Sequence, residues 1–102
     1  MVRGDIWWYE SPRVPVRPYV ILTRSPAIPM LTQILAVPTT RTVRGIPTEV
    51  ALGPDDGMPE VCVVSLDNMT SIRGEFCLSK IATLDDVKMR QICEALTTAT
   101  DC

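Results

Sequence analysis

Proline and glycine are the residues that most constrain how this chain can fold. Nine prolines and five glycines occur among its 102 residues. Proline lacks a backbone N–H and fixes its own φ, so it interrupts helices and central strands. The chain is therefore expected to form many short elements joined by turns. At this length, they are expected to form a single domain, residues 1–102, with a modest core.

Most of the predicted elements are strands. Residues 5–10 alternate, with Ile6 and Trp8 on one face and Trp7 and Tyr9 on the other. The further strands, which are rich in β-branched and apolar residues, are predicted at 19–23, 33–37 with a continuation through Thr39 and Thr40, 49–52, 61–66 and 76–82. The intervening segments are predicted as loops and turns at 11–16, 25–29 (with room for one helical turn), 41–47, 53–57 and 67–74.

The last element is predicted to be a helix. Thr83 precedes Asp86 at the spacing of a capping box, and acidic residues crowd the first turn. An apolar stripe follows, typical of a core or dimer contact, and consists of Leu84, Met89, Ile92, Cys93 and Leu96. Many short strands and a closing helix favour a mainly β (α+β) fold, built on a small, strongly bent antiparallel sheet or partly closed barrel.

Charge is distributed unevenly along the chain, although the net charge is only −2. Residues 1–45 carry a balance of +4 and residues 46–102 a balance of −6. Every basic residue of the first part is an arginine, whose planar guanidinium stays protonated and suits phosphate. These are Arg3, Arg13, Arg17, Arg24, Arg41 and Arg44. The pattern favours a local anion site, and chance clustering on a solvated face is the alternative.

Several classes of protein are disfavoured. No apolar run approaches the roughly 20 residues that span a bilayer, and the amino terminus has no long apolar stretch of the secretory kind. A cytoplasmic protein without membrane contact is therefore expected. The four cysteines are widely spaced and histidine is absent, whereas metal sites usually combine closely spaced ligands and often use histidine. Free thiols are expected, with no metal site and no cofactor.

One arginine has a restrained backbone. Pro18 fixes its own φ and pushes Arg17 toward extended geometry, so the guanidinium leaves a defined strand entrance. The surrounding motif, RGDIWW followed by RPYVIL, resembles the opening of the MazF (PemK-like) family of toxin endoribonucleases. The segments PTTRTVRGIPTEV and CVVSLDNMTSIRG are similar to later motifs of that family and occur in the same order. The resemblance covers most of the chain.

The resemblance implies an SH3-like partial barrel with a C-terminal helix. It implies the toxin of a type II toxin–antitoxin system, a metal-independent endoribonuclease that cleaves single-stranded RNA at a short sequence by 2′-hydroxyl attack. A homodimer and inhibition by a MazE-type antitoxin are implied as well. The alternative is a non-catalytic toxin that binds protein, since a gyrase inhibitor shares this fold and fold does not determine function.

On the same resemblance, Arg17 matches the family's active arginine and Thr40 its active threonine. A shift of the alignment by one residue would select Thr39 in place of Thr40. Arg17 would neutralise the charge on the scissile phosphate, and Thr40 would donate a hydrogen bond or orient the attacking hydroxyl. Arginine is a poor base at neutral pH, so Glu10 is the candidate proton acceptor. The alternatives are a surface ion pair for Arg17, a strand-end hydroxyl for Thr40 and a solvated carboxylate for Glu10.

Further residues are candidates for binding RNA. Arg13, Arg41 and Arg44 are suited to neighbouring phosphates, with salt-sensitive affinity as the expected signature. Trp8 or Trp7 can stack an unpaired base; the alternative is that one indole lies in the core and the other faces a dimer partner. The loop from Glu10 to Val16 is shorter than in the family and lacks its G-S-E-x-like segment. That loop covers substrate in the family, so the departure bears on sequence preference and efficiency more than on the reaction class.

Overall fold

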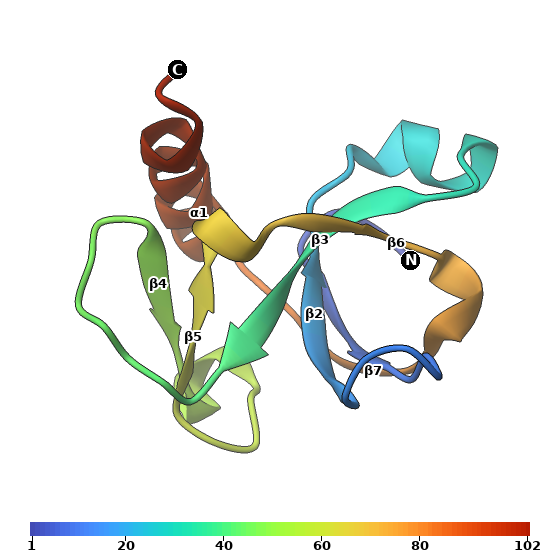
Figure 1. The fold of residues 1–102 in the computed structure, drawn as a ribbon, viewed down its shortest axis with the longest axis horizontal. Coiled ribbons are helices and arrows are strands. Elements are labelled where there is room, and N and C mark those ends of the chain that lie inside the picture. Colours follow the sequence, from blue (N-terminus) through green and yellow to red (C-terminus); the bar gives the residue numbers. More distant parts are fainter.

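The computed structural model describes residues 1–102 as a strongly bent antiparallel sheet with one helix beside it (Figure 1). The strands and the helix are β1 (Asp5–Tyr9), β2 (Arg17–Ile21), β3 (Ile34–Thr40), β4 (Glu49–Leu52), β5 (Cys62–Ser65), β6 (Thr70–Ile72), β7 (Cys77–Thr83) and α1 (Asp86–Thr100). Four short 3₁₀ helices join them: η1 (Ser25–Met30), η2 (Pro54–Asp56), η3 (Leu66–Asn68) and η4 (Gly74–Phe76). The predicted bent sheet with a C-terminal helix is confirmed.

Strand β3 is shared by the two halves of the sheet. The strand order is β4-β5-β3-β2-β1-β7, and β6 also pairs with β3. Residues Ala36 to Pro38 of β3 pair with β2. On its other edge, β3 pairs with β6 near its start and with β5 at its end. Figure 1 shows the result: β4 and β5 lie on one side of β3, with β2 and β7 on the other.

The core consists of two clusters on opposite faces of the central strands. Val20 of β2 belongs to a cluster of 13 residues that also takes in the buried side of α1. Its neighbours Tyr19 and Ile21 belong to a second cluster of six. Both faces of β2 are therefore buried, as a continuous apolar run predicts. The strand begins at Arg17, two residues earlier than the predicted 19–23.

The predicted start of the helix is wrong. Thr83 ends β7 and pairs with Asp5, so it is not available to cap a helix. Asp85 is the N-cap instead, and its carboxylate accepts a hydrogen bond from the N–H of Lys88 at 2.8 Å. The predicted apolar stripe is also shifted, because Cys93 is exposed. The buried positions of α1 are Met89, Ile92 and Ala95.

Strand β6 was missed as a strand. Only Ile72 of its three residues is buried, and the other two are an exposed threonine and serine. Such a short segment has no alternation to detect, and its extended form depends on pairing with the start of β3.

The helix α1 lies against β4 and η3, and no helix of the structure is both long and apolar enough to span a membrane.

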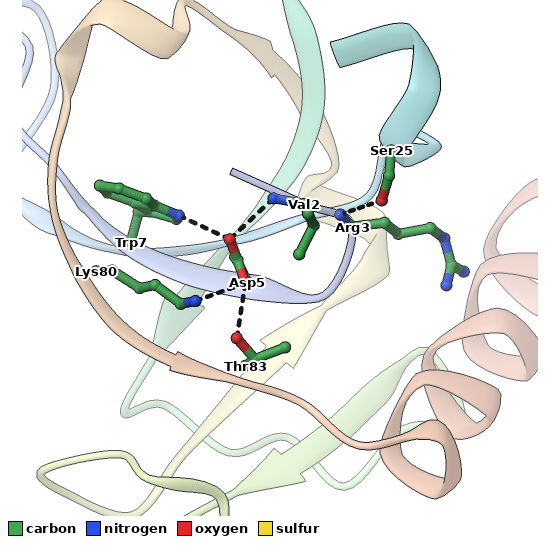
Figure 2. Close-up of polar contacts among 7 residues, drawn as sticks. All are labelled: Val2, Arg3, Asp5, Trp7, Ser25, Lys80 and Thr83. Atoms are coloured by element: carbon green, nitrogen blue, oxygen red, sulfur yellow. Dashed lines mark hydrogen bonds and ion pairs between the residues drawn. The ribbon is translucent and has the colours of Figure 1, made fainter. Parts of the chain in front are cut away.

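A buried carboxylate ties the two strands β1 and β7 to the amino terminus (Figure 2). Asp5 is 1% exposed. Its carboxylate accepts hydrogen bonds from the hydroxyl of Thr83 at 2.7 Å, the N–H of Val2 at 2.9 Å and the indole of Trp7 at 3.3 Å. The Nζ of Lys80 lies 3.4 Å away. Burial acts to raise the pKa of Asp5, but these hydrogen bonds and the Lys80 charge lower it overall.

Candidate active site

An open cleft of about 430 Å³ lies where β2 begins and β3 ends. Five of the eight residues singled out from the sequence line this cleft: Trp8, Arg17, Thr39, Thr40 and Arg41. The other lining residues are Val16, Pro18, Thr42, Met58, Pro59, Glu60 and Cys62. Segments far apart in the sequence therefore meet at one concave surface that carries both guanidiniums and hydroxyls.

Antiparallel register explains why Arg17 and Thr40 meet. The β2–β3 pairs run from Ile21 with Ala36 to Tyr19 with Pro38. Extending that register by two positions matches Arg17 with Thr40, which assigns both residues to the same face of the sheet. On its other edge, the end of β3 pairs with β5, through Thr40 and Val63. The start of β2, the end of β3 and residues just before β5 all line the cleft.

Arg17 brings an uncompensated positive charge to the cleft. Its side chain is half-buried, and its backbone pairs with Tyr9. The four ion pairs of the chain involve other cations, so Arg17 is not part of a surface ion pair. Its charge acts on Tyr19, whose pKa is raised by burial and drawn partly back down by the guanidinium. The charge of Arg17 is available to an anionic ligand.

Thr40 is better placed than Thr39 to donate a hydrogen bond into the cleft. The Thr40 hydroxyl oxygen accepts a hydrogen bond from the N–H of Thr42 at 3.2 Å. Since that oxygen is already accepting, its proton is free to be donated to a ligand. Thr39 is only 6% exposed. It lies on the same face of β3 as Val37, which is buried in the larger core cluster. The geometry therefore favours Thr40.

Two further residues of the cleft were not identified from the sequence. Glu60 forms an ion pair with Arg41 at 2.9 Å on the rim. Cys62 is buried, and burial raises the pKa of its thiol, assisted by the charges of Asp56 and Glu60. Nothing in the sequence marks Glu60, which follows an acidic turn and stands 19 residues from Arg41. Pairing of β3 with β5, which matches Thr40 with Val63, brings the two together.

Three predicted residues lie outside the cleft. Glu10 is exposed past the end of β1, where its N–H donates to the carbonyl of Phe76, so the backbone holds it toward η4. Arg13 lines a separate groove of about 490 Å³ together with Arg73 and aromatic side chains. Arg44 is exposed in the loop 41–47, where its N–H binds the Glu49 carboxylate.

The side chains that could bind a metal ion do not cluster in this structure. No group of three or more cysteine, aspartate or glutamate residues is arranged to hold a metal ion. All four cysteines are free: Cys62 is buried, Cys77 is half-buried, and Cys93 and Cys102 are exposed. Burial raises the pKa of Cys77 to about 11. The chemical groups of the cleft are therefore guanidiniums, hydroxyls, one carboxylate and one protonated thiol.

Comparison with known proteins establishes the family. Residues 2–100 match the family described as PemK-like, MazF-like toxin of type II toxin–antitoxin system. This chain belongs to that family. The resemblance stated from the sequence motifs is thereby confirmed for nearly the whole MazF-like chain, including the segments that carry Arg17 and Thr40.

Relatives of this MazF-like toxin are found among both sequences and structures. It is 41% identical over 101 residues to the probable endoribonuclease MazF5 of Mycobacterium tuberculosis. The matched region covers 98% of this chain and 93% of that protein. The M. tuberculosis toxin MazF-mt6 is 33% identical with a TM-score of 0.86, over 95% and 96% of the two chains. An endoribonuclease from Mycobacterial species, solved in complex with its cognate antitoxin, is 26% identical with a TM-score of 0.89, over 99% and 95%.

Proposed function

We propose that this MazF-like toxin is a metal-independent endoribonuclease that cleaves single-stranded RNA at a short recognition sequence. The observation that carries the proposal is the meeting of Arg17 and Thr40 in one cleft, with the guanidinium free of any ion pair. A permanent cation beside a hydroxyl donor is suited to a phosphodiester. Relatives named as endoribonucleases, at 41% and 30% identity over nearly whole chains, support the same activity.

In the proposed reaction, a ribose 2′-hydroxyl attacks the adjacent phosphorus and displaces the 5′-oxygen of the next nucleotide. The products are a 2′,3′-cyclic phosphate and a 5′-hydroxyl end. Negative charge develops on the non-bridging phosphate oxygens during attack, and Arg17 stabilises it. Thr40 donates a hydrogen bond to one of these oxygens. A preorganised donor of this kind contributes roughly 3–4 kcal/mol to the transition state.

The proposal needs no metal ion, because the cleft provides its own cation. The guanidinium of Arg17 keeps its charge at any physiological pH. It can therefore take the part that a Lewis acid takes in other phosphoryl transfers. Metal independence is tested directly by cleavage in the presence of excess chelator.

Residues around the cleft are proposed to hold the RNA on either side of the scissile bond. Trp8 is half-buried at the cleft and offers its face to an unpaired base, an interaction worth roughly 1–3 kcal/mol. Arg41 is on the rim, and Arg13 and Arg44 are exposed beyond it. We propose that these arginines bind neighbouring phosphates. Single-stranded RNA is favoured because its bases and 2′-hydroxyls are accessible.

A MazE-type antitoxin and a second copy of the chain are the proposed protein partners. Support for the antitoxin comes from the relative that was solved with its cognate antitoxin. An acidic antitoxin segment would compete with RNA for the guanidiniums of Arg17 and Arg41. The proposed location is the cytoplasm, where the RNA substrate is found.

The deciding experiment maps 5′ ends after purified protein is added to defined transcripts in excess chelator. Discrete fragments that share a short sequence around the cut are expected. The cyclic phosphate and the 5′-hydroxyl are identified because each end must be repaired enzymatically before an adaptor can be joined to it. Intact RNA, together with capture of a protein such as gyrase, would instead favour the non-catalytic alternative.

A further inference from the structure

The proposed reaction needs a proton acceptor, and the cleft contains one suitable group. The attacking 2′-hydroxyl must lose its proton as the new bond to phosphorus forms. The chain has no histidine, and an arginine does not lose its proton in proteins. Glu10 lies outside the cleft. Glu60 is the only aspartate or glutamate among the residues that line it.

Pairing of β3 with β5 holds Glu60 close to the reacting groups. Thr40 pairs with Val63, so the residues just before β5 enter the cleft beside Thr40. Pro59 and Cys62, on either side of Glu60, also line it. Proline restricts the backbone at residue 59, and Cys62 is anchored by its burial in the larger core cluster. The carboxylate is thus carried by a short segment restrained at both ends.

The ion pair with Arg41 orients the Glu60 carboxylate. One guanidinium nitrogen lies 2.9 Å from Oε1, and no group of the chain donates to Oε2. The side chain of Glu60 is 53% exposed, so Oε2 can receive a proton from a ligand in the open cleft. The other charged or titratable groups that line the cleft are Arg17 and Cys62, and the charge of Asp56 acts on the Cys62 thiol together with that of Glu60.

We propose that Glu60 is the catalytic residue that accepts the proton of the attacking 2′-hydroxyl, an assignment that rests on the proposed ribonuclease function. In this step the O2′–H bond breaks and the proton passes to Oε2 of Glu60, while O2′ bonds to phosphorus. The bond from phosphorus to the 5′-oxygen breaks, and that oxygen takes a proton from water. The hydroxide left behind removes the proton from Glu60 and restores the carboxylate. Arg41 acts as a positioning residue for Glu60.

The test compares Glu60→Gln with the wild-type protein on one RNA substrate. The amide keeps the shape but cannot take the proton, so kcat is expected to fall by about 10²- to 10⁴-fold. Affinity for a non-cleavable RNA, with a 2′-deoxyribose at the scissile nucleotide, should stay within about threefold of the wild-type affinity. Binding does not depend on the proton acceptor that the variant lacks. The wild-type rate should decline in acid, and the variant should lose that decline. Glu60→Asp should retain part of the rate.

Asp55→Asn is the matched control. Asp55 is an exposed carboxylate of the neighbouring turn η2, outside the cleft and without an ion pair. This variant should cleave at the wild-type rate, and circular dichroism should show that both variants fold. If Glu60→Gln cleaves as fast as wild type at every pH, or loses only affinity, the role of Glu60 is overturned while the proposed function stands. If Glu10→Gln, rather than Glu60→Gln, loses the decline of the cleavage rate in acid, the role of Glu60 is likewise overturned. If the wild-type protein does not cleave RNA, the proposed function fails, and the role of Glu60 fails with it.

Discussion

Arg17 and Thr40 occupy matching positions in the β2–β3 register, two residues beyond its last pair, and both line the same cleft. The end of β3 pairs with β5 on its other edge, and residues from β2, β3 and the segment before β5 line the cleft. A permanent cation and a hydroxyl with a free proton are thereby held on rigid strand ends rather than on loops. Preorganisation of this kind is what electrostatic stabilisation of a transition state requires.

Replacement of the guanidinium is expected to abolish cleavage. Arg17→Ala should lower kcat by about 100-fold or more, because the charge that opposes the developing oxyanion is removed. The helix content and the oligomeric state should not change, since Arg17 has no ion pair to lose. RNA hydrolysis in excess chelator measures the effect. Arg24→Ala removes an exposed arginine outside the cleft and serves as the control; undiminished cleavage by Arg17→Ala would remove Arg17 from the mechanism.

The two neighbouring threonines are expected to differ. Thr40→Val removes the hydroxyl whose proton is free, and kcat should fall by about 100-fold. Thr40→Ser keeps that hydroxyl and should stay within about tenfold of wild type. Thr39→Val changes a side chain that faces the core, so its effect on kcat should be smaller than that of Thr40→Val. Single-turnover cleavage gives the comparison, and the reverse order would transfer the role to Thr39.

The salt dependence of RNA binding should reveal which exposed arginines contact phosphates. Arg13→Ala and Arg44→Ala should each reduce the slope of log affinity against log salt by about 0.7, the value for one phosphate of a single strand. Arg90→Ala, on the exposed side of α1, should leave the slope unchanged. The measurement uses fluorescence anisotropy with RNA that cannot be cleaved. An unchanged slope in Arg13→Ala would mean that RNA does not reach the groove containing Arg13.

The buried carboxylate is expected to stabilise the fold at neutral pH. Asp5→Asn places an amide N–H₂ where donors from Val2, Trp7 or Thr83 need an acceptor, and should cost about 1.5–3 kcal/mol of unfolding free energy. The pKa of Asp5 is lowered in the folded protein, so this contribution is fully present above the unfolded pKa. It is lost as the pH falls through the lower folded pKa.

Urea unfolding at a constant protein concentration tests this stabilisation, because assembly would otherwise change the apparent stability. The difference between wild type and Asp5→Asn should be largest at neutral pH and shrink below about pH 4. Asp55→Asn, which alters an exposed carboxylate, should unfold like wild type. A difference that persists unchanged in acid would mean that the charge of Asp5 does not contribute.

The four cysteines should react at different rates with iodoacetamide. The thiolate is the reactive form, and burial raises the pKa of Cys62 and takes that of Cys77 to about 11. Cys93 and Cys102 are exposed and should be alkylated first. In urea all four should react alike. Mass spectrometry of digested protein after timed labelling checks the order, and early modification of Cys77 would contradict its burial.

The local sequence was sufficient for most of the sheet. Alternation in residues 5–10 correctly separated Trp8, which faces the cleft, from Trp7, which packs on the other side and binds Asp5. The strand at Glu49–Leu52 was predicted with the bounds that it has in the structure. These features depend on the two-residue period of a strand and on turn residues, both of which act between near neighbours.

The local sequence pattern did not predict features that depend on pairing between segments distant in the sequence. The cap of α1 is Asp85 because Thr83 is occupied by Asp5 at the far end of the chain. Strand β6 is extended because β3 lies beside it. Neither contact leaves a signal in the residues close by, since hydrogen bonds between strands join segments of any separation.

The sequence by itself determined the family, the run of strands and the extended backbone at Arg17. Only the tertiary structure decided which charges share the cleft. It brought Glu60 to Arg41 across 19 residues and kept Glu10 outside. The physical reason is that side-chain periodicity and proline geometry are set by adjacent residues, whereas the neighbours of a side chain in space are set by strand order and register.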